Sequence, residues 1–265
     1  MDDLTDFVRR HDPDRFFCAL FAPAPARPAL FALIALNHEL ARAREAASHP
    51  IAALIRLQWW RDAIEEAAAG QPARRHEVAG PLHVAITAGA LAPRDLLGLV
   101  DTREIETEEG GIPTRASFGA YLRAGAGGLA LAMAAVLRVP EAAWPEVQRR
   151  GAFQGLAGVL RNLPAHAAQG RCLLPRDALA EAGLSAEAVI DTPALAAQLC
   201  RALAAEGAQT LESGTALPRS ALPLALGFRL ARRDLRRIAA GRPVPSPRGL
   251  ADKAVLAWAG LRGRA

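Results

Sequence analysis

In FALIALNHELAR, residues 31–42, an apolar run gives way to polar and charged side chains. We expect a helix over 27–47 around this stretch, because Pro28 is well tolerated in a first turn and Pro50 breaks a helix that precedes it. Apolar residues make up 51% of the chain, chiefly Ala and Leu, while β-branched and aromatic residues are sparse. That bias is typical of helices. The sequence therefore favours an all-α fold.

Apolar residues at helical spacing, bounded by glycine and proline, predict further helices along the chain. They are expected at about 51–69, 78–89, 94–108, 115–137, 140–163, 193–211, 220–240 and 250–261, with short helices after Pro175. No linker divides the chain and no repeat recurs. Residues 1–265 are therefore expected to form a single helical domain.

Glycines interrupt the apolar stretch 115–137 at Gly119, Gly125, Gly127 and Gly128. Each glycine inside a helix costs about 1 kcal/mol relative to alanine, so this cluster indicates close helix contact or a kink. Farther along, Pro164 is expected to interrupt or end the helix over 140–163.

The formal charge is +5 with a pI near 10.0, and Lys253 is the only lysine among many arginines. Such a surface attracts anionic lipid, phosphorylated substrates or an acidic protein partner. The chain carries no helix-turn-helix signature, aromatic RNA-binding motif or zinc spacing. We therefore expect no nucleic-acid partner.

Three widely spaced cysteines, Cys18, Cys172 and Cys200, form no CxxC motif and fit a reducing compartment. The apolar run 30–36 is far too short to span a bilayer, and no signal-peptide pattern opens the chain. We expect a cytoplasmic protein, and peripheral contact with the inner face of the membrane stays open.

Three segments, in this order, resemble the squalene/phytoene synthase family. The first is 31–42, where family members carry an aromatic-rich stretch that ends in Asp-Asp-x-x-Asp. The second, RLQWWRD at 56–62 followed by Gly70, resembles the family's Trp-Arg-Glu helix and its Gly-x-Pro end. The third, LRNLPAHAAQGRCLLP at 160–175, resembles the segment Leu-Arg-Asp-x-x-x-Asp with its Gly-Arg-x-Tyr-Leu-Pro tail. The combination covers most of the chain and is far more specific than any one piece.

The resemblance implies one large helical bundle of the isoprenoid synthase type with a central cavity. In that family the two aspartate motifs face each other across the cavity and hold magnesium against prenyl diphosphates. Carboxylates spaced i, i+4 lie on one helical face, and magnesium prefers their oxygens together with those of phosphates.

This chain departs from the family pattern at the metal-ligand positions. The candidate site residues are Asn37, His38, Glu39 and Arg42 in the first segment, and Arg161, Asn162, His166 and Arg171 in the third. With histidine neutral, replacement of three and then two carboxylates changes the charge by +5. At an effective dielectric of 20, each unit charge pair at 4 Å contributes about 4 kcal/mol. We therefore expect no metal and no cofactor; magnesium would bind only if the chain were a transferase.

The departures resemble one branch of the family, the mitochondrial respiratory complex I assembly factors. That branch has a similar Phe-Asn-x-Glu-Leu-Ala and, later, Leu-Arg, two variable residues and Pro-x-His. The matching positions here are Asn37, Glu39, Leu40 and Ala41, then Leu160, Arg161, Pro164 and His166. The resemblance implies a non-catalytic assembly or chaperone-like factor whose partner is a protein, for example a complex I subunit.

Two other functions stay open. A head-to-head prenyl transferase acting on prenyl diphosphates is supported by Gly170-Arg171 and the Trp-Arg helix, and is opposed by the missing carboxylates. A non-catalytic module could instead keep an apolar cavity for an isoprenoid or lipid ligand. We favour the non-enzymatic function over the transferase.

The replaced motifs also suggest local contacts. Glu39 and Arg42 are expected to form an i, i+3 ion pair that lines the cavity. His38 and His166 could meet Glu39 at a transition-metal site, but we favour hydrogen-bonded interior or surface roles for both histidines.

Aromatic and basic side chains outside these motifs are candidates for a partner surface. Adjacent Trp59 and Trp60 point in different directions on a helix, so we expect one in the core and one, with Arg61, at a groove or partner surface. Burial of both is the alternative. A basic strip precedes the apolar terminal helix that contains Trp258, and an anionic membrane or acidic partner could bind it. The strip consists of Arg229, Arg232, Arg233, Arg236 and Arg237.

Overall fold

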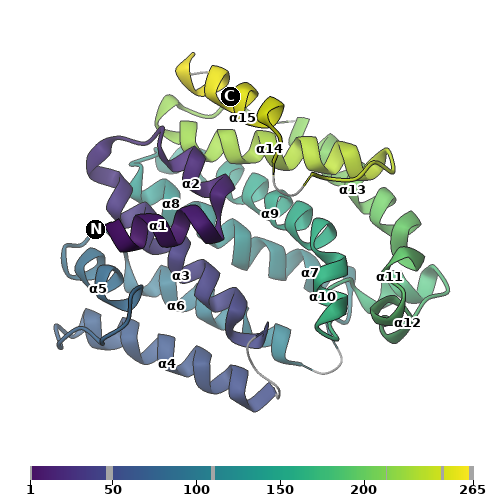
Figure 1. Ribbon diagram of the computed structural model, residues 1–265, viewed down its shortest axis with the longest axis horizontal. Helices are drawn as coiled ribbons and strands as arrows, with labels where there is room; N and C mark the ends of the chain where they lie inside the picture. The colour runs from purple at the N-terminus through teal and green to yellow at the C-terminus, as the bar shows by residue number, and fades with distance from the viewer. Residues whose placement is uncertain (1, 46–49, 109–110, 213, 246–247, 263–265) are drawn as a thin grey trace.

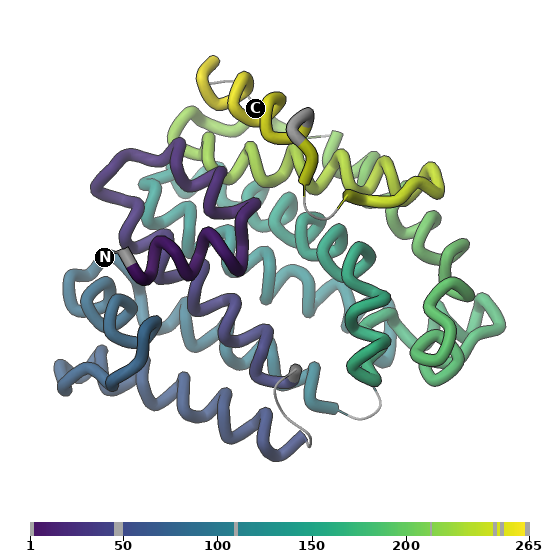
Figure 2. The backbone as a smooth tube through the Cα atoms, in the orientation of Figure 1, coloured from purple at the N-terminus to yellow at the C-terminus, as the bar shows by residue number. Residues whose placement is uncertain are grey.

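Helices supply the regular structure of the chain in a computed structural model, which describes residues 2–45, 50–108, 111–212, 214–245 and 248–262. Within these ranges no strand occurs, and the helices pack around one another as Figures 1 and 2 show. The expectation of an all-α fold is confirmed.

The helices follow the chain order of Figure 1. They are α1 (Asp2–His11), α2 (Pro13–Ala19), α3 (Arg27–Glu45), α4 (Pro50–Ala68), α5 (Ala79–Thr87), α6 (Pro93–Thr102), α7 (Arg115–Leu122), α8 (Gly128–Val136), α9 (Trp144–Arg161), α10 (Leu163–Ala168), α11 (Arg176–Glu181), α12 (Ala186–Asp191), α13 (Ala197–Glu212), α14 (Leu222–Ala239) and α15 (Leu250–Leu261). Short 3-10 turns are η1 (Ala24–Ala26), η2 (Glu104–Thr107), η4 (Glu141–Ala143), η5 (Pro193–Ala196) and η6 (Arg219–Ala221), and η3 (Arg123–Gly127) is π-helical.

The expected long helices are confirmed to within a few residues. Residues 46 and 47 of the first predicted helix lie outside the described residues. The stretch 94–108 is two elements, α6 and η2, because Arg103 ends the α-helix and a 3-10 turn follows. Positive φ angles at Gly70 and Gly241 end α4 and α14 in the left-handed conformation that glycine adopts without strain.

The two N-terminal helices were missed by the sequence patterns. In α1 the apolar residues Leu4, Phe7 and Val8 recur at helical spacing and are buried. Asp12 then caps α2, because its carboxylate accepts a hydrogen bond from the backbone N–H of Arg15 at 3.0 Å. A short polar helix gives a weak periodic signal, yet this corner supplies one wall of the cavity described below.

Glycines bring α9 against the stretch from α7 to α8, and both the expected close contact and the expected irregularity are present. The stretch turns π-helical at 123–127. A Cβ added at Gly151 would lie 2.6 Å from Ala130 Cβ, and one added at Gly155 would lie 2.6 Å from Ala126 Cβ. No side chain larger than hydrogen fits there without displacing the backbone of the neighbouring element.

One described helical run is long and apolar enough to cross a membrane. It is Arg115–Val136, with a mean hydropathy of 1.3, and 44% of that apolar stretch is buried. Its glycine contacts with α9 make it part of the helical core.

Two large apolar clusters flank the centre of the molecule. The first surrounds α3, whose Leu33, Ile34 and Leu36 are fully covered by the helices α1, α4, α5 and α8. The second joins α9, α13 and α14 to the smaller helices α10, α11 and α12. The polar faces of α3 and α9 that these clusters leave uncovered border the cavity.

Candidate functional site

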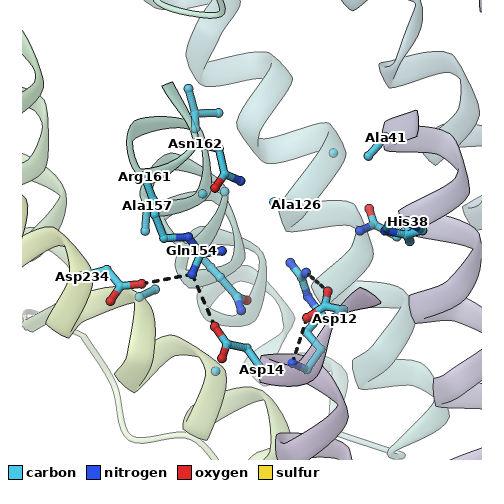
Figure 3. A pocket seen from close by; sticks show the side chains of 18 of the residues that line it. Asp12, Asp14, His38, Ala41, Ala126, Gln154, Ala157, Arg161, Asn162 and Asp234 are labelled. Atoms are coloured by element: carbon cyan, nitrogen blue, oxygen red, sulfur yellow. Dashed lines mark hydrogen bonds and ion pairs between the residues drawn. The ribbon is translucent and has the colours of Figure 1, made fainter. Parts of the chain in front are cut away.

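A polar cavity of about 580 Å³ lies between the two apolar clusters. The α1–α2 corner, α3, η2, the π-helical segment, α9, α10, α14 and the segment before α15 contribute to its wall. Its polar lining residues are His11, Asp12, Asp14, Arg15, Asn37, His38, Arg42, Arg103, Glu106, Tyr121, Gln154, Arg161, Asn162, His166, Arg171, Asp234 and Arg248. In Figure 3, His38 and Asn162 occupy opposite sides of this space. The structure thus brings the two replaced motifs to one site.

His38 stands on the α3 wall and is half-buried. Its ring stacks on His11 with 4.5 Å between ring centroids, and Phe7 contacts it edge-on at 5.5 Å. Burial, followed by the charges of the nearby His11 and Arg42, lowers the pKa of His38 to about 4. His38 is therefore neutral at neutral pH, and its buried Nε2 has no hydrogen-bond partner.

The expected Glu39–Arg42 ion pair forms, with 3.7 Å between Arg42 Nη1 and Glu39 Oε1. Only Arg42 lines the cavity, however, so the expectation that both residues of the pair would do so is wrong for Glu39. The Arg42 side chain keeps 48% of its surface exposed. A cation thus stands where the family has a metal-binding carboxylate.

The second motif lies at a helix break. The α-helix α9 ends at Arg161, Asn162 adopts φ −94° and ψ 7°, and α10 starts with Pro164 in its first turn. The expectation that Pro164 interrupts the helix is confirmed. Asn162 is exposed and His166 is half-buried, and they lie on different helices rather than on one continuous face.

His166 is neutral for the same reason as His38. Burial, followed by the charge of the Arg171 guanidinium, lowers the pKa of His166 to about 4, and Glu106 opposes this shift only in part. Its buried Nδ1 has no hydrogen-bond partner. The less favoured alternative, a transition-metal site of His38, His166 and Glu39, is not formed, because no group of three or more His, Cys, Asp or Glu among the described residues is placed to hold a metal ion.

A buried ion-pair cluster that the sequence patterns did not single out connects α2, α9, α14 and the segment before α15. Arg248 donates two hydrogen bonds of 2.6 Å to the carboxylate of Asp234, and its Nε lies 2.9 Å from Asp14 Oδ2. Arg161 reaches the same two carboxylates at 3.4 and 3.5 Å (Figure 3). Burial opposes the charge of Arg248, but the hydrogen bonds that it donates to Asp234 and the charge of Asp14 raise its pKa.

A second cluster surrounds Glu106, whose side chain is 4% exposed. Arg103 and Tyr121 donate hydrogen bonds to its Oε1 at 2.6 and 2.7 Å, and Arg171 binds its other oxygen. Burial disfavours the carboxylate, yet Arg103 and Arg171 more than offset this and lower the pKa of Glu106. Arg103 also donates a hydrogen bond of 3.0 Å to the side chain of Asn37, which ties the first motif to this cluster.

The charges of the cavity wall do not fit magnesium. Four carboxylates line it, and each is bound by at least one arginine. The wall also carries six arginines, so six positive and four negative charges leave +2 with histidine neutral. Magnesium needs free oxygen ligands, usually carboxylates. Among the described lining residues, every carboxylate already forms an ion pair with an arginine of the protein itself.

Three of the five arginines in the basic strip on α14 form ion pairs with neighbouring helices. Arg233 and Arg237 bind the buried Asp252 of α15 at 2.8 and 3.2 Å, and Arg236 pairs with Glu212 of α13. Burial, together with Arg236 and Arg229, lowers the pKa of Arg232, whose Nε is buried without a partner. These three paired arginines therefore hold α14 to α13 and α15, because their spacing on α14 matches the carboxylates of Glu212 and Asp252.

Trp59, Trp60 and Arg61 lie outside the cavity. Trp60 is 4% exposed in the core, whereas Trp59 is partly buried with the Arg74 guanidinium 5.0 Å from its ring centroid. Arg61 pairs with Asp101 at 2.6 Å and with Glu104 at 2.8 Å. This group joins α4 to α6 and η2 rather than facing a ligand.

The two neutral histidines predict a pH dependence of stability. Their folded pKa of about 4 lies below the ordinary histidine pKa of 6.5, so the unfolded chain binds more protons between these values and stability rises with pH. From pH 7 to pH 5 each histidine should lower the free energy of unfolding by roughly 1 kcal/mol, after discounting for partial exposure. Urea unfolding of the wild type and a His38→Leu/His166→Leu variant measures this. If the free energy of unfolding changed equally with pH in both proteins, this prediction would be wrong.

Comparison with known proteins agrees with this geometry. The sequence model of the family described as squalene/phytoene synthase matches residues 8–250. A squalene synthase from Alicyclobacillus acidocaldarius superposes with a TM-score of 0.67 at 17% identity, over 91% of this chain and 94% of the other. A dehydrosqualene synthase solved with a ligand gives 0.72 at 13% identity, over 98% and 94%. At such identities the structural similarity establishes the fold.

Among curated proteins, similar sequences carry the name NADH dehydrogenase (ubiquinone) complex I, assembly factor 6. The protein from Rattus norvegicus is 28% identical over 183 residues, which are 69% of this chain and 55% of that protein. The one from Homo sapiens is 27% identical over the same share of each chain. The chain thus spans about half the length of these relatives. Because the family match extends over most of the sequence and the bundle reproduces the fold, the chain belongs to the squalene/phytoene synthase family.

Proposed function

We propose that this protein is a non-catalytic member of its family and acts as an assembly factor for respiratory complex I. The observation that carries the proposal is the cavity itself, in which the metal-ligand positions hold His38, Arg42, Asn162 and His166. The relatives named as complex I assembly factors support the same function.

The chemistry of the cavity argues against prenyl transfer. Ionisation of a prenyl diphosphate needs divalent cations that bridge carboxylates and phosphate oxygens. Here Asp14 and Asp234 are held by Arg161 and Arg248, and Glu106 is held by Arg103 and Arg171. Freeing Glu106 would leave the buried Arg171 guanidinium without its counter-charge, which is strongly unfavourable. Freeing Asp234 would leave the buried Arg248 with Asp14 alone. We therefore propose that the protein needs neither magnesium nor another cofactor.

The proposed partner is a protein component of complex I, and the proposed location is the cytoplasmic side, with peripheral contact at the inner face of the membrane. The names of the relatives and the net charge of +5 support this proposal.

A non-catalytic binding module is the second candidate, and the cavity favours it. A volume of about 580 Å³ lies in the range of small-molecule sites. The excess of two arginines over carboxylates suits the anionic head of an isoprenoid or lipid ligand better than a neutral molecule. This candidate is compatible with an assembly role, and like that role it involves no catalysed reaction.

Deletion of the protein in its host tests the proposed function. We expect loss of assembled complex I and of NADH-dependent respiration, because an assembly factor acts before the complex can turn over. Squalene- and phytoene-type hydrocarbons should stay unchanged. Native gels with an NADH dehydrogenase stain and solvent extraction of the same cells provide the two measurements.

Complementation with the wild-type chain controls for secondary effects and should restore the assembled complex. Loss of the hydrocarbons with intact complex I would overturn the proposal and support the prenyl transferase. Normal levels of both would show that the protein serves neither pathway.

A further inference from the structure

The outward edge of α15 combines exposed apolar and basic side chains. Trp258 and Leu261 keep 60% and 81% of their surface exposed, and Leu20, at the end of α2, keeps 38%. Figure 1 shows α15 at the margin of the molecule along α14. We call Trp258, Leu261, Lys253 and Arg262 the α15 edge.

The opposite face of α15 is anchored, so the α15 edge has a fixed orientation. Leu256 and Ala259 pack into a small core with Cys18 and Leu230. Gly260 abuts the ring of Phe21, because a Cβ at this position would lie 2.2 Å from that ring. Asp252 is 2% exposed and is held by two arginines of α14. The helix cannot rotate to bury Trp258 without breaking these contacts.

The charge of the α15 edge is entirely positive. Lys253 and Arg262 are exposed, and the Arg262 guanidinium lies 4.0 Å from the ring centroid of Trp258. Asp252, the only acidic residue of α15, is buried and neutralised, so it does not offset these cations. An indole ring beside a cation suits the boundary between lipid headgroups and acyl chains, where tryptophan is enriched.

We propose that the α15 edge docks this protein on an anionic lipid surface, with Trp258 and Leu261 inserted at the headgroup level and Lys253 and Arg262 against the lipid phosphates. Because Lys253 and Arg262 are cations, the lipid bound at the α15 edge is expected to be anionic. A stable protein interface needs about 800 Å² per partner, far more than two large apolar side chains supply, whereas shallow insertion assisted by cations suffices at a membrane. This surface is separate from the cavity and does not depend on the proposed assembly function.

Sedimentation of the purified full-length chain with vesicles tests the docking. We expect retention on vesicles of phosphatidylcholine and phosphatidylglycerol at low salt, weak retention on phosphatidylcholine alone, and release at high salt. Trp258→Ser or Leu261→Ser should each lower the partition coefficient about tenfold. The Lys253→Gln/Arg262→Gln variant should lower it about 25-fold, because each cation near an anionic surface contributes about fivefold.

Ile55→Ser on α4 is the matched control, because Ile55 is 64% exposed and lies on another helix. It should bind like the wild type. Brominated lipid should quench tryptophan fluorescence, and Trp258→Phe should remove most of that quenching while retaining binding, because the other three tryptophans are buried or partly buried. All variants should keep the wild-type urea midpoint, since the altered side chains point outward.

Several results would overturn the proposal. Wild-type binding by Trp258→Ser and Leu261→Ser would exclude the α15 edge, and a loss in Ile55→Ser would move the contact to α4. Equal retention on neutral and anionic vesicles would exclude the role of the cations. Absence of vesicle binding, together with self-association that Trp258→Ser abolishes, would identify the edge as a contact between two copies of this chain.

Discussion

Replacing Asp234 with alanine is expected to lower the free energy of unfolding by about 3–5 kcal/mol, the range for breaking a buried ion pair by removing one partner. Asp234 is 2% exposed and accepts both 2.6 Å hydrogen bonds from Arg248, whose side chain is itself 9% exposed. The variant leaves that guanidinium and Arg161 with only Asp14 as a nearby counter-charge. Urea unfolding followed by circular dichroism measures the loss.

Glu212→Ala is the control for this prediction. Glu212 also pairs with an arginine of α14, Arg236, but the two side chains are 45% and 56% exposed. Exposed pairs contribute about 0–1 kcal/mol, so this variant should unfold nearly like the wild type. If the two variants lost similar stability, the buried cluster would not be what holds α2 and the segment before α15 to the bundle.

The second large effect is expected for Gly151→Ala on α9, which should lose about 1–3 kcal/mol by overpacking. The new Cβ would lie 2.6 Å from Ala130 Cβ and 2.9 Å from the backbone oxygen of Ala126. Backbone cannot move aside like a flexible side chain, so α9 must separate from the π-helical segment. Thermal and urea unfolding measure the change.

Gly158→Ala, two turns later on the same helix, should have the opposite sign. Nothing lies within 4 Å of a Cβ at Gly158, so alanine should stabilise the helix by about 0.5–1 kcal/mol through its higher helix propensity. No loss of stability in Gly151→Ala would contradict the close packing of α8 and α9. A loss of stability in Gly158→Ala would contradict the open space beside that glycine.

Much of the fold could be predicted because its signals are local. The helix 250–261 was predicted with the bounds that α15 has, and Pro164 marked the break between α9 and α10. The glycine cluster indicated the contact and the π-helical irregularity of 123–127. Propensity, proline geometry and glycine spacing act over a few residues, so one sequence reveals them. That residues 1–265 form one domain stays a prediction.

The candidate site could be predicted only in part. The family resemblance implied that the two replaced motifs face one cavity, and His38, Arg42, Asn162 and His166 all line it. Asp12 and Asp14 were overlooked because α1 and α2 are short and polar. A signal did exist there: Asp12 precedes Pro13, which is typical of a helix start.

By itself the sequence determined the helical class, the positions of the breaks and the loss of the metal-binding carboxylates, since each depends on neighbours in the chain. The tertiary structure alone decided the pairing of charges that lie far apart in the chain, whereas the i, i+3 pair of Glu39 and Arg42 was expected from the sequence. Asp14 and Arg248 are 234 positions apart and meet because α2 and the segment before α15 pack on α14. For the same reason, arginines of the basic strip pair with Asp252 of α15 and with Glu212 of α13. An ion pair requires its groups within about 4 Å, and that distance is set by packing rather than by sequence separation.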